Sequence, residues 1–307
     1  MSNQKEIRAR ISSTISTQQI TKAMKLVSAT KLRKASEAIT RMRPYALKLQ
    51  GIMSNLQESA DDDQLAVYFQ QREARKIAIV VITSDRGLCG AFNANVIKKT
   101  RGLLSDMEKG EGSWMNWTKL MGGKKLNTHD NVEIICIGKK GAEGLKRLGY
   151  AVNTDYIDIL NGMNADVAFG TADKLINRFI SGDLDRVEVV YNQFKNAATQ
   201  ILSHETLLPV SSSDSENSNV NSDYLFEPSK VDILKDLIPR SVKTQLYRAI
   251  LDSLASEHGA RMVAMDKATE NAGELLGDLR LAYNQARQAA ITREISEIVG
   301  GVAALEG

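Results

Sequence analysis

Cysteine and histidine are scarce in this sequence of 307 residues. The two cysteines, Cys89 and Cys136, have no metal-ligand neighbour at short spacing, so neither a disulfide framework nor a zinc site is predicted. We expect both to be small buried side chains. The three histidines, His129, His204 and His258, are scattered, which supports neither a metal cluster nor a Ser/His/Asp arrangement. We therefore expect no metal and no cofactor.

Long hydrophobic runs are also missing. No apolar stretch approaches the roughly 18 residues that cross a bilayer. No apolar segment follows a basic start at the N-terminus, as it would in a secretory signal peptide. The sequence therefore predicts a soluble protein that is made and kept in the cytosol.

Glycine is absent from residues 3 to 50, and Pro44 is the only proline up to residue 57. This region is rich in Ala, Lys, Met, Leu and Gln, which favours a long helix over residues 1–57. Pro44 should kink or end it. Apolar residues at helical spacing predict its buried face, namely Ile20, Met24 and Val27, then Ala35, Ala38 and Met42.

Acidic residues are rare in the same region. Residues 1–50 hold eleven Lys or Arg and two Glu, which gives a formal charge of +9 there and −6 over the rest of the chain. Such a basic segment favours an anionic partner, which is nucleic acid, a membrane surface or an acidic protein. A solvated helix face accounts for the charge equally well.

Residues 75–228 change character to β-branched runs separated by helical stretches. We expect helices near residues 91–107, 140–148 and 164–181, between strands that read KIAIVVI from Lys76, VEIICI from Val132 and RVEVVY from Arg186. Strands that alternate with helices predict an α/β fold, here a small Rossmann-like domain with a largely parallel sheet. Two polar stretches, residues 108–126 with Trp114 and Trp117, and residues 211–223, read as surface loops.

The helical pattern returns over residues 229–307. Apolar residues step by three and four along a heptad seam, namely Met265, Ala268, Ala272, Leu275, Leu279, Ala282, Ala286 and Ala289. Small seam residues allow two helices to approach closely. We therefore expect a long antiparallel coiled coil of the N- and C-terminal helices, in which residue 3 lies near residue 284.

The apolar stripe of the C-terminal helix changes phase beyond residue 285. It continues at Ile291, Ile295, Ile298 and Val302, an offset of two residues or about 200° around the helix axis. No partner in the same chain is left for roughly 30 Å of this helix. An uncovered apolar tip is an interaction surface, so we infer that other chains enclose it. A frayed terminus is the alternative.

Two other functions deserve consideration. The stretch VVITSDRGLCGAFN runs from a strand through Gly87 and Gly90 into a helix, as phosphate-binding turns do. It lacks the GxGxxG and GK[ST] patterns, so a structural turn is favoured over an enzyme site. A basic coiled coil that binds nucleic acid is also less favoured, because the seam pairs with a distant segment of the same chain.

Three long motifs carry a resemblance that covers nearly the whole chain. They are KEIRARISSTISTQQITKAMKLVSATKLRKA, SDRGLCGAFN, and LASEHGARMVAMDKATENAGELLGDLRLAYNQARQAAITREISEIVGG. In this order they resemble the gamma subunit of bacterial F-type ATP synthase.

The resemblance implies a central rotor shaft with no catalytic activity of its own. The tip of the coiled coil would turn in an apolar sleeve of three alpha and three beta subunits, and the α/β domain would stand on the c ring beside the epsilon subunit. Ion-driven rotation of the ring would then change the catalytic sites in turn for ATP synthesis. The chain would lie on the cytoplasmic side of the inner membrane, attached only through the complex, with no nucleic acid as partner.

The resemblance also assigns residues. Contacts with beta subunits fall on Met24, Arg261, Arg287, Gln288, Thr292 and Glu294. The apolar bearing falls on Ile291, Ile295, Ile298 and Val302, and the foot near the c ring and epsilon on Tyr224, Phe226 and Glu227. Lys22, Lys25, Lys31, Arg33 and Lys34 either attract acidic loops or serve solubility. Residues 108–126 look like an insertion without the cysteine pair of chloroplast members, so thiol control is not supported.

Overall fold

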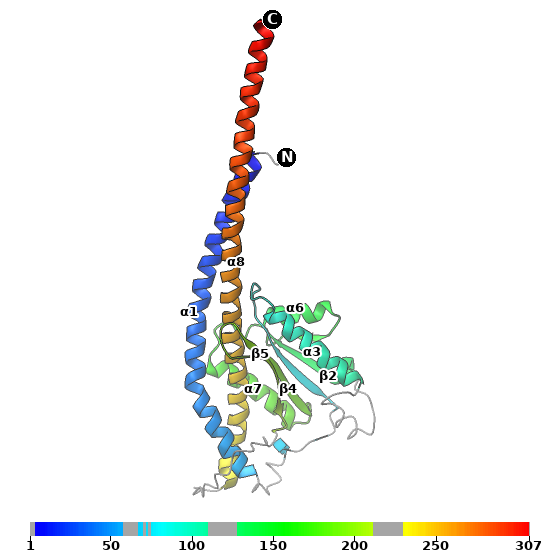
Figure 1. Ribbon diagram of the computed structural model, residues 1–307. Helices are drawn as coiled ribbons and strands as arrows, with labels where there is room; N and C mark the ends of the chain where they lie inside the picture. Colours follow the sequence, from blue (N-terminus) through cyan, green and yellow to red (C-terminus); the bar gives the residue numbers. More distant parts are fainter. Residues whose placement is uncertain are drawn as a thin grey trace. The chain divides into compact units, whose positions relative to one another are not determined.

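The computed structural model describes residues 4–57, 67–69, 72, 75–109, 128–210 and 230–306. Two long helices flank an α/β region in the sequence (Figure 1). The elements are α1 (Gln4–Gln57), β1 (Ile77–Ile82), α3 (Phe92–Lys109), α5 (Thr128–Asn131), β2 (Val132–Ile137), α6 (Lys139–Arg147), β3 (Val152–Asn153), α7 (Ala165–Ile180), β4 (Arg186–Phe194), β5 (Gln200–Leu208) and α8 (Lys230–Glu306).

The five strands form one sheet in the order β3-β2-β1-β4-β5. β1 pairs in parallel with β2 and β4, and β2 pairs in parallel with β3. Of the strands that the structure describes, β5 alone is antiparallel, to β4. All six residues of β1 are buried, as expected for the central strand of a sheet covered on both faces. The predicted largely parallel α/β fold is confirmed.

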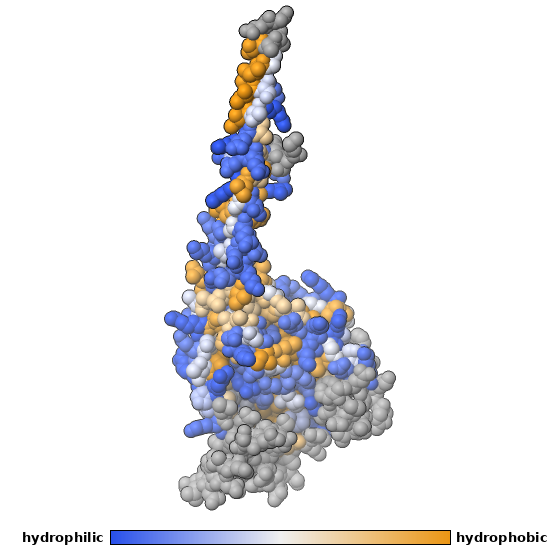
Figure 2. Space-filling model, in the orientation of Figure 1, coloured by the Kyte–Doolittle hydropathy of each residue, from blue (hydrophilic) through white to orange (hydrophobic). Residues whose placement is uncertain are grey.

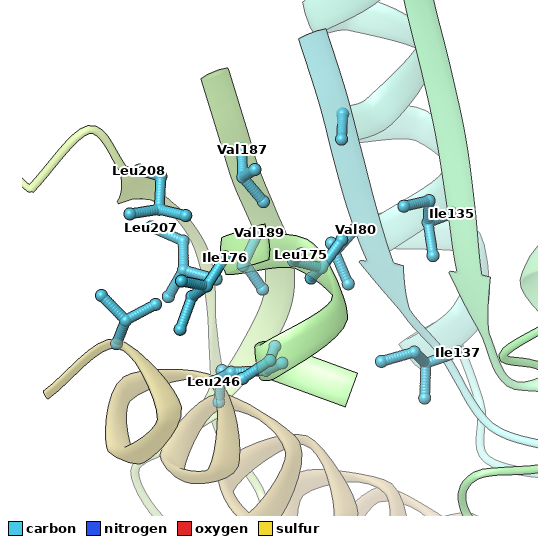
Figure 3. Close-up of a cluster of buried hydrophobic side chains, with 14 of the residues drawn as sticks. Val80, Ile135, Ile137, Leu175, Ile176, Val187, Val189, Leu207, Leu208 and Leu246 are labelled. Atoms are coloured by element: carbon cyan, nitrogen blue, oxygen red, sulfur yellow. The ribbon is translucent and has the colours of Figure 1, made fainter. Parts of the chain in front are cut away.

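Helices cover both faces of this sheet. On one face, α7 and the first part of α8 pack on alternate strand residues such as Val80, Ile135 and Val189 (Figure 3). On the other face, α3 and α6 pack on the intervening strand residues, which include Ile79 and Cys136. Because successive strand residues point to opposite faces, the β-branched runs supply both cores at once.

The chain divides into two compact units. Residues 30–260 form one unit, which contains the whole sheet and the adjoining parts of α1 and α8. Residues 1–29 and 261–307 form the other, in which α1 and α8 run side by side in opposite directions. The boundaries expected from the sequence, residues 1–57, 75–228 and 229–307, follow secondary structure and stay predictions.

Pro44 does not end α1, which continues to Gln57, and α8 likewise continues through Pro239. Around Pro44, the face of α1 that carries Ile39 and Met42 packs on Leu251 and Ala255 of α8. We infer that this packing outweighs the single backbone hydrogen bond that a proline removes.

Within residues 4–29, the predicted buried face of α1 is wrong at Ile20 and Val27, whereas Met24 is partly buried. Ile20 and Val27 are 60% and 55% exposed, whereas Thr21 and Ser28 are 8% and 3% exposed. The hydroxyls of Thr21 and Ser28 donate to the backbone carbonyls of Gln18 and Met24 within α1. Small side chains that satisfy their own polar groups fit a close helix–helix contact better than Ile or Val.

The predicted seam of α8 is right at Met265 and Ala272 and wrong at Leu275. Met265 and Ala272 are buried as predicted, but Leu276 is buried at 6% exposed while Leu275 is 50% exposed. Residues three and four positions along a helix both lie near the same face. Because apolar residues occupy both positions, their spacing alone did not decide between them.

Candidate interaction surfaces

The antiparallel pair of residues 4–29 and 261–306 has a defined register. Thr269 Oγ1 donates to Thr21 Oγ1 at 2.8 Å, and Lys25 Nζ lies 2.5 Å from Asp266 Oδ1. By this register the first turn of α1 lies opposite about residue 286 of α8, close to the predicted 284. From Arg287 to Val302, every side chain except Ala290 is exposed.

The predicted apolar bearing forms one stripe on this exposed part of α8. Ile291, Ile295, Ile298 and Val302 are 48%, 56%, 65% and 50% exposed. Figure 2 shows an apolar run along this end of the helix. Steps of four, three and four residues keep the stripe on one face. Val299, 62% exposed, borders it and was missed because it lies outside the heptad steps.

The predicted polar residues flank this stripe. At about 100° per residue, Arg287 and Glu294 lie on one side of it and Gln288 and Thr292 on the other. All four are exposed. The Thr292 hydroxyl donates to the backbone carbonyl of Gln288 at 3.0 Å, so it is held within the helix.

The remaining beta-facing candidates lie elsewhere. Met24 is partly buried on α1, and Arg261 is only 7% exposed. Their contact with a beta subunit stays a prediction, and for Arg261 only a small part of the side chain is open to a partner. The foot residues Tyr224, Phe226 and Glu227 lie outside the described residues, as does most of the insertion at residues 108–126.

The basic residues of α1 differ in what they contact. Lys22, Lys31, Arg33 and Lys34 are exposed, and Lys25 is partly buried. Lys25 pairs with Asp266 on α8. Arg33 Nε lies 3.7 Å from Glu37 Oε1 in the next turn of α1. Exposed pairs of this kind contribute little to stability. The charge of this surface is therefore largely open to a partner.

The turn after β1 is occupied by its own side chains. Ser84 Oγ donates to the Arg86 carbonyl at 2.6 Å, and Asn93 Nδ2 donates to Ser84 Oγ at 2.7 Å. Thr83 and Asp85, at the same turn, also accept hydrogen bonds from the backbone N–H groups of Gly141 and Lys139 at the start of α6. These two N–H groups are therefore already paired and are not open to an anion. This arrangement favours the predicted structural turn.

Close packing is found just before α6, whereas a Cβ on Gly87 or Gly90, in the turn after β1 itself, would meet nothing within 4 Å. A Cβ on Gly138, which has φ +101°, would lie 2.3 Å from the Thr83 carbonyl oxygen.

Among the described residues, no group of three His, Cys, Asp or Glu side chains is placed to hold a metal ion. No helix in the described ranges is long and apolar enough to cross a membrane.

The fold and the exposed helix define a class of protein, in which two long paired helices flank a Rossmann-like domain in the sequence. Comparison with known proteins identifies the family within this class to which the chain belongs. The family model described as ATP synthase matches residues 3–305. The ATP synthase gamma chain of Cytophaga hutchinsonii is 49% identical over 308 residues, covering 99% of each chain. That of Flavobacterium johnsoniae is 50% identical over 307 residues, covering both chains fully.

The chain therefore belongs to the ATP synthase gamma-chain family. Solved structures agree in fold. A chain of the Euglena gracilis mitochondrial ATP synthase, in the OSCP/F1/c-ring structure, superposes with a TM-score of 0.64 at 22% identity, covering 98% of this chain and 94% of that one.

Proposed function

We propose that this chain is the central shaft of an F-type ATP synthase, which couples ion-driven rotation of the c ring to the catalytic alpha and beta subunits. The exposed apolar stripe of α8 carries the proposal. Four side chains that are each about half exposed or more on one helix face favour association with another apolar surface. A sleeve formed by the ends of three alpha and three beta subunits supplies such a surface and still permits rotation, because apolar contacts are not directional.

The shaft acts through its asymmetry. A single helix with an apolar stripe, Arg287 and Glu294 on one side, and Gln288 and Thr292 on the other presents a different face to each of three identical beta subunits. Arg287 can hold a carboxylate by charge-assisted hydrogen bonds, which are specific and still breakable. Met24 and the small open part of Arg261 add further beta contacts. In this role the chain performs no bond chemistry itself.

The foot residues are the proposed contact with the membrane sector. Tyr224, Phe226 and Glu227 contact the c ring and the epsilon subunit, so the chain is held on the cytoplasmic side of the inner membrane through the complex. The lack of a membrane-spanning helix in the described residues is compatible with such attachment. The cations of α1, including Lys22, Lys31 and Arg33, lie on the surface that acidic loops of neighbouring subunits would approach.

Reconstitution with alpha and beta subunits from the same source tests the proposal. One copy of the wild-type chain should assemble with three alpha and three beta subunits. ATP hydrolysis should be faster than that of the alpha and beta subunits alone. Ile298→Asp places a charge in the sleeve and should weaken assembly strongly. Ser296→Asp adds the same charge on the far side of the helix and should assemble nearly as the wild type does.

Circular dichroism should show both variant chains equally folded, because both positions are exposed. If Ile298→Asp assembles as well as Ser296→Asp does, the stripe is not enclosed by the partner subunits and the proposal fails.

A further inference from the structure

The connection between β3 and α7 contains the pair Asn161–Gly162, the only Asn-Gly pair in the sequence. Both residues are exposed. Gly162 has a φ of +79°, and a Cβ built there would meet nothing within 4 Å. The pair is therefore open to water.

These two residues carry groups that can react with each other. The backbone nitrogen of a residue that follows Asn can attack the side-chain amide carbon, because ring closure between them gives a five-membered imide. Most side chains hinder this attack through their Cβ, which lies beside the nitrogen. Glycine has no Cβ, so this hindrance is absent at Gly162.

The hydrogen bonds of Asn161 leave its side-chain amide only weakly held. Its backbone N–H donates to the Asp158 carbonyl at 2.9 Å, whereas its Nδ2 is 3.3 Å from Asp158 Oδ1, slightly longer than usual for such a bond. Among the described residues, no hydrogen bond engages Asn161 Oδ1 or the N–H of Gly162. The amide can therefore turn toward the Gly162 nitrogen.

Two other exposed asparagines are held differently. Asn164 caps α7, and its Oδ1 accepts from the backbone N–H of Val167 at 2.9 Å. Asn196 Oδ1 accepts from two backbone N–H groups at 3.0 and 2.7 Å. Each of the two is also followed by an alanine, whose Cβ hinders the attack. Asn161 differs from both in its hydrogen bonds and in its neighbour.

We propose that Asn161–Gly162 is a site of spontaneous deamidation in the folded chain. The Gly162 nitrogen forms a bond to Cγ of Asn161, and the bond from Cγ to Nδ2 breaks. The released amino group takes up the proton that the Gly162 nitrogen loses and leaves as ammonia. One water molecule then opens the imide to aspartate or isoaspartate. No oxidant or reductant takes part.

The product changes both the charge and the backbone of this connection. It places a new negative charge beside Asp158, whose Oδ1 lies 3.1 Å from Lys139 Nζ. Isoaspartate also reroutes the main chain through the side-chain carbon. The reaction does not depend on the proposed shaft function and goes beyond it.

The test follows the full-length chain during incubation in mildly alkaline buffer. Peptides from timed samples are sequenced by mass spectrometry, which locates each amide that has become a carboxylate. A methyltransferase specific for isoaspartate, supplied with S-adenosylmethionine, detects that product separately. Conversion should accumulate at Asn161 while Asn164 and Asn196 of the same samples stay intact.

A synthetic peptide of residues 156–166 gives the rate without the fold. The folded chain should convert within about tenfold of the peptide rate, because the fold leaves both reacting groups open.

Variants identify the reacting groups. Gly162→Ala should slow conversion about tenfold, because the added Cβ hinders the nitrogen and disfavours a φ of +79°. Asn161→Gln should remove conversion at this position, since the larger ring that it would form closes slowly. Asn196→Gln, also at an exposed position, is the matched control and should leave the rate at Asn161 unchanged.

Circular dichroism shows whether each variant keeps its fold. If Gly162→Ala does not fold, the wild-type time course and the comparison with the peptide decide the question. The proposal is overturned if Asn161 stays intact while the peptide converts, if Asn164 and Asn196 convert equally fast, or if folded Gly162→Ala converts as the wild type does.

Discussion

Arg287 and Gln288 are exposed side chains whose value lies in what they contact in the assembled complex. Exposed positions of this kind change the stability of a chain by about 0.5 kcal/mol or less when they are truncated. A charge-assisted hydrogen bond to a partner subunit contributes more free energy than this. Losing it at a step that limits turnover lowers the rate of ATP hydrolysis. Stability and turnover therefore separate the two roles of these residues.

Replacing Arg287 and Gln288 together by Ala should lower the ATPase turnover of the reconstituted complex about tenfold. The unfolding midpoint of the chain should hardly change. The matched control replaces Arg280 and Gln285, which are exposed earlier on the same helix, and should leave turnover near the wild-type rate. Equal losses of turnover in both double variants would point away from a specific contact with beta.

Two buried carboxyl groups should respond to pH with opposite signs. Burial acts to raise the pKa of Glu188, but a hydrogen bond from His204 and the nearby Arg186 outweigh it, so this pKa is lowered. The stability that Glu188 contributes is present above its unfolded pKa of 4.5 and is lost as pH falls. Asp252 has a raised pKa, so its contribution falls as pH rises from 3.8 to about 6.

Urea unfolding of the full chain at several pH values measures both effects. Relative to the wild type, Glu188→Gln should be least stable near neutral pH, and the deficit should shrink as the solution is acidified below about pH 4.5. Asp252→Asn should gain stability relative to the wild type as pH rises from about 4 to about 7. The same pH trend in both variants would contradict the assigned environments.

At the scale of elements, the sequence predicted the strands well and the helix seams poorly. The runs that begin near Lys76, Val132 and Arg186 became β1, β2 and β4, because a buried parallel strand is continuously apolar. β5 was not predicted, since its residues 200–207 are mostly only partly buried at the edge of the sheet and mix polar with apolar side chains.

The seam of α1 shows why periodicity of apolar residues was not enough. Thr21 and Thr269 meet through their hydroxyls at 2.8 Å, and a Cβ on Gly273 would lie 3.2 Å from Gln18 Nε2. Such a close approach selects for small side chains, whose polarity hides them from a search for apolar residues. Ile20 and Val27 stay on the surface for the same reason.

Substitution should reveal this seam directly. Thr21→Leu should destabilise the chain by about 1–3 kcal/mol, because the larger side chain does not fit against Thr269. Ile20→Gln, at the neighbouring exposed position, should change stability by about 0.5 kcal/mol or less. Thermal or urea unfolding measures both. If Ile20→Gln were the more harmful change, the contact with α8 would instead be made by the apolar face of α1 that carries Ile20 and Val27.

At the scale of the whole molecule, the candidate site was predictable in part. The stripe from Ile291 to Val302 followed from its change of phase, and the structure places it on an exposed face. The exposure of the residues that flank it, Arg287 to Glu294, agrees with a surface role, but what they contact depends on partners that no single chain contains. The pocket lined by Ile39, Gln193 and Asp252 was not predictable, because it joins distant residues of α1, β4 and α8.

The central claim is that this chain turns inside the alpha and beta subunits, and rotation is its most direct test. Cys89 and Cys136 are 1% and 0% exposed, and burial raises the pKa of Cys136 to about 12, so neither thiol should react readily. Lys99→Cys, on the exposed face of α3, then offers a single attachment point for a visible probe.

With the alpha and beta subunits fixed to a surface, the probe on Lys99→Cys should turn in one direction when ATP is added and stop when ATP is removed. A probe that stays still while the same complexes hydrolyse ATP would contradict the account.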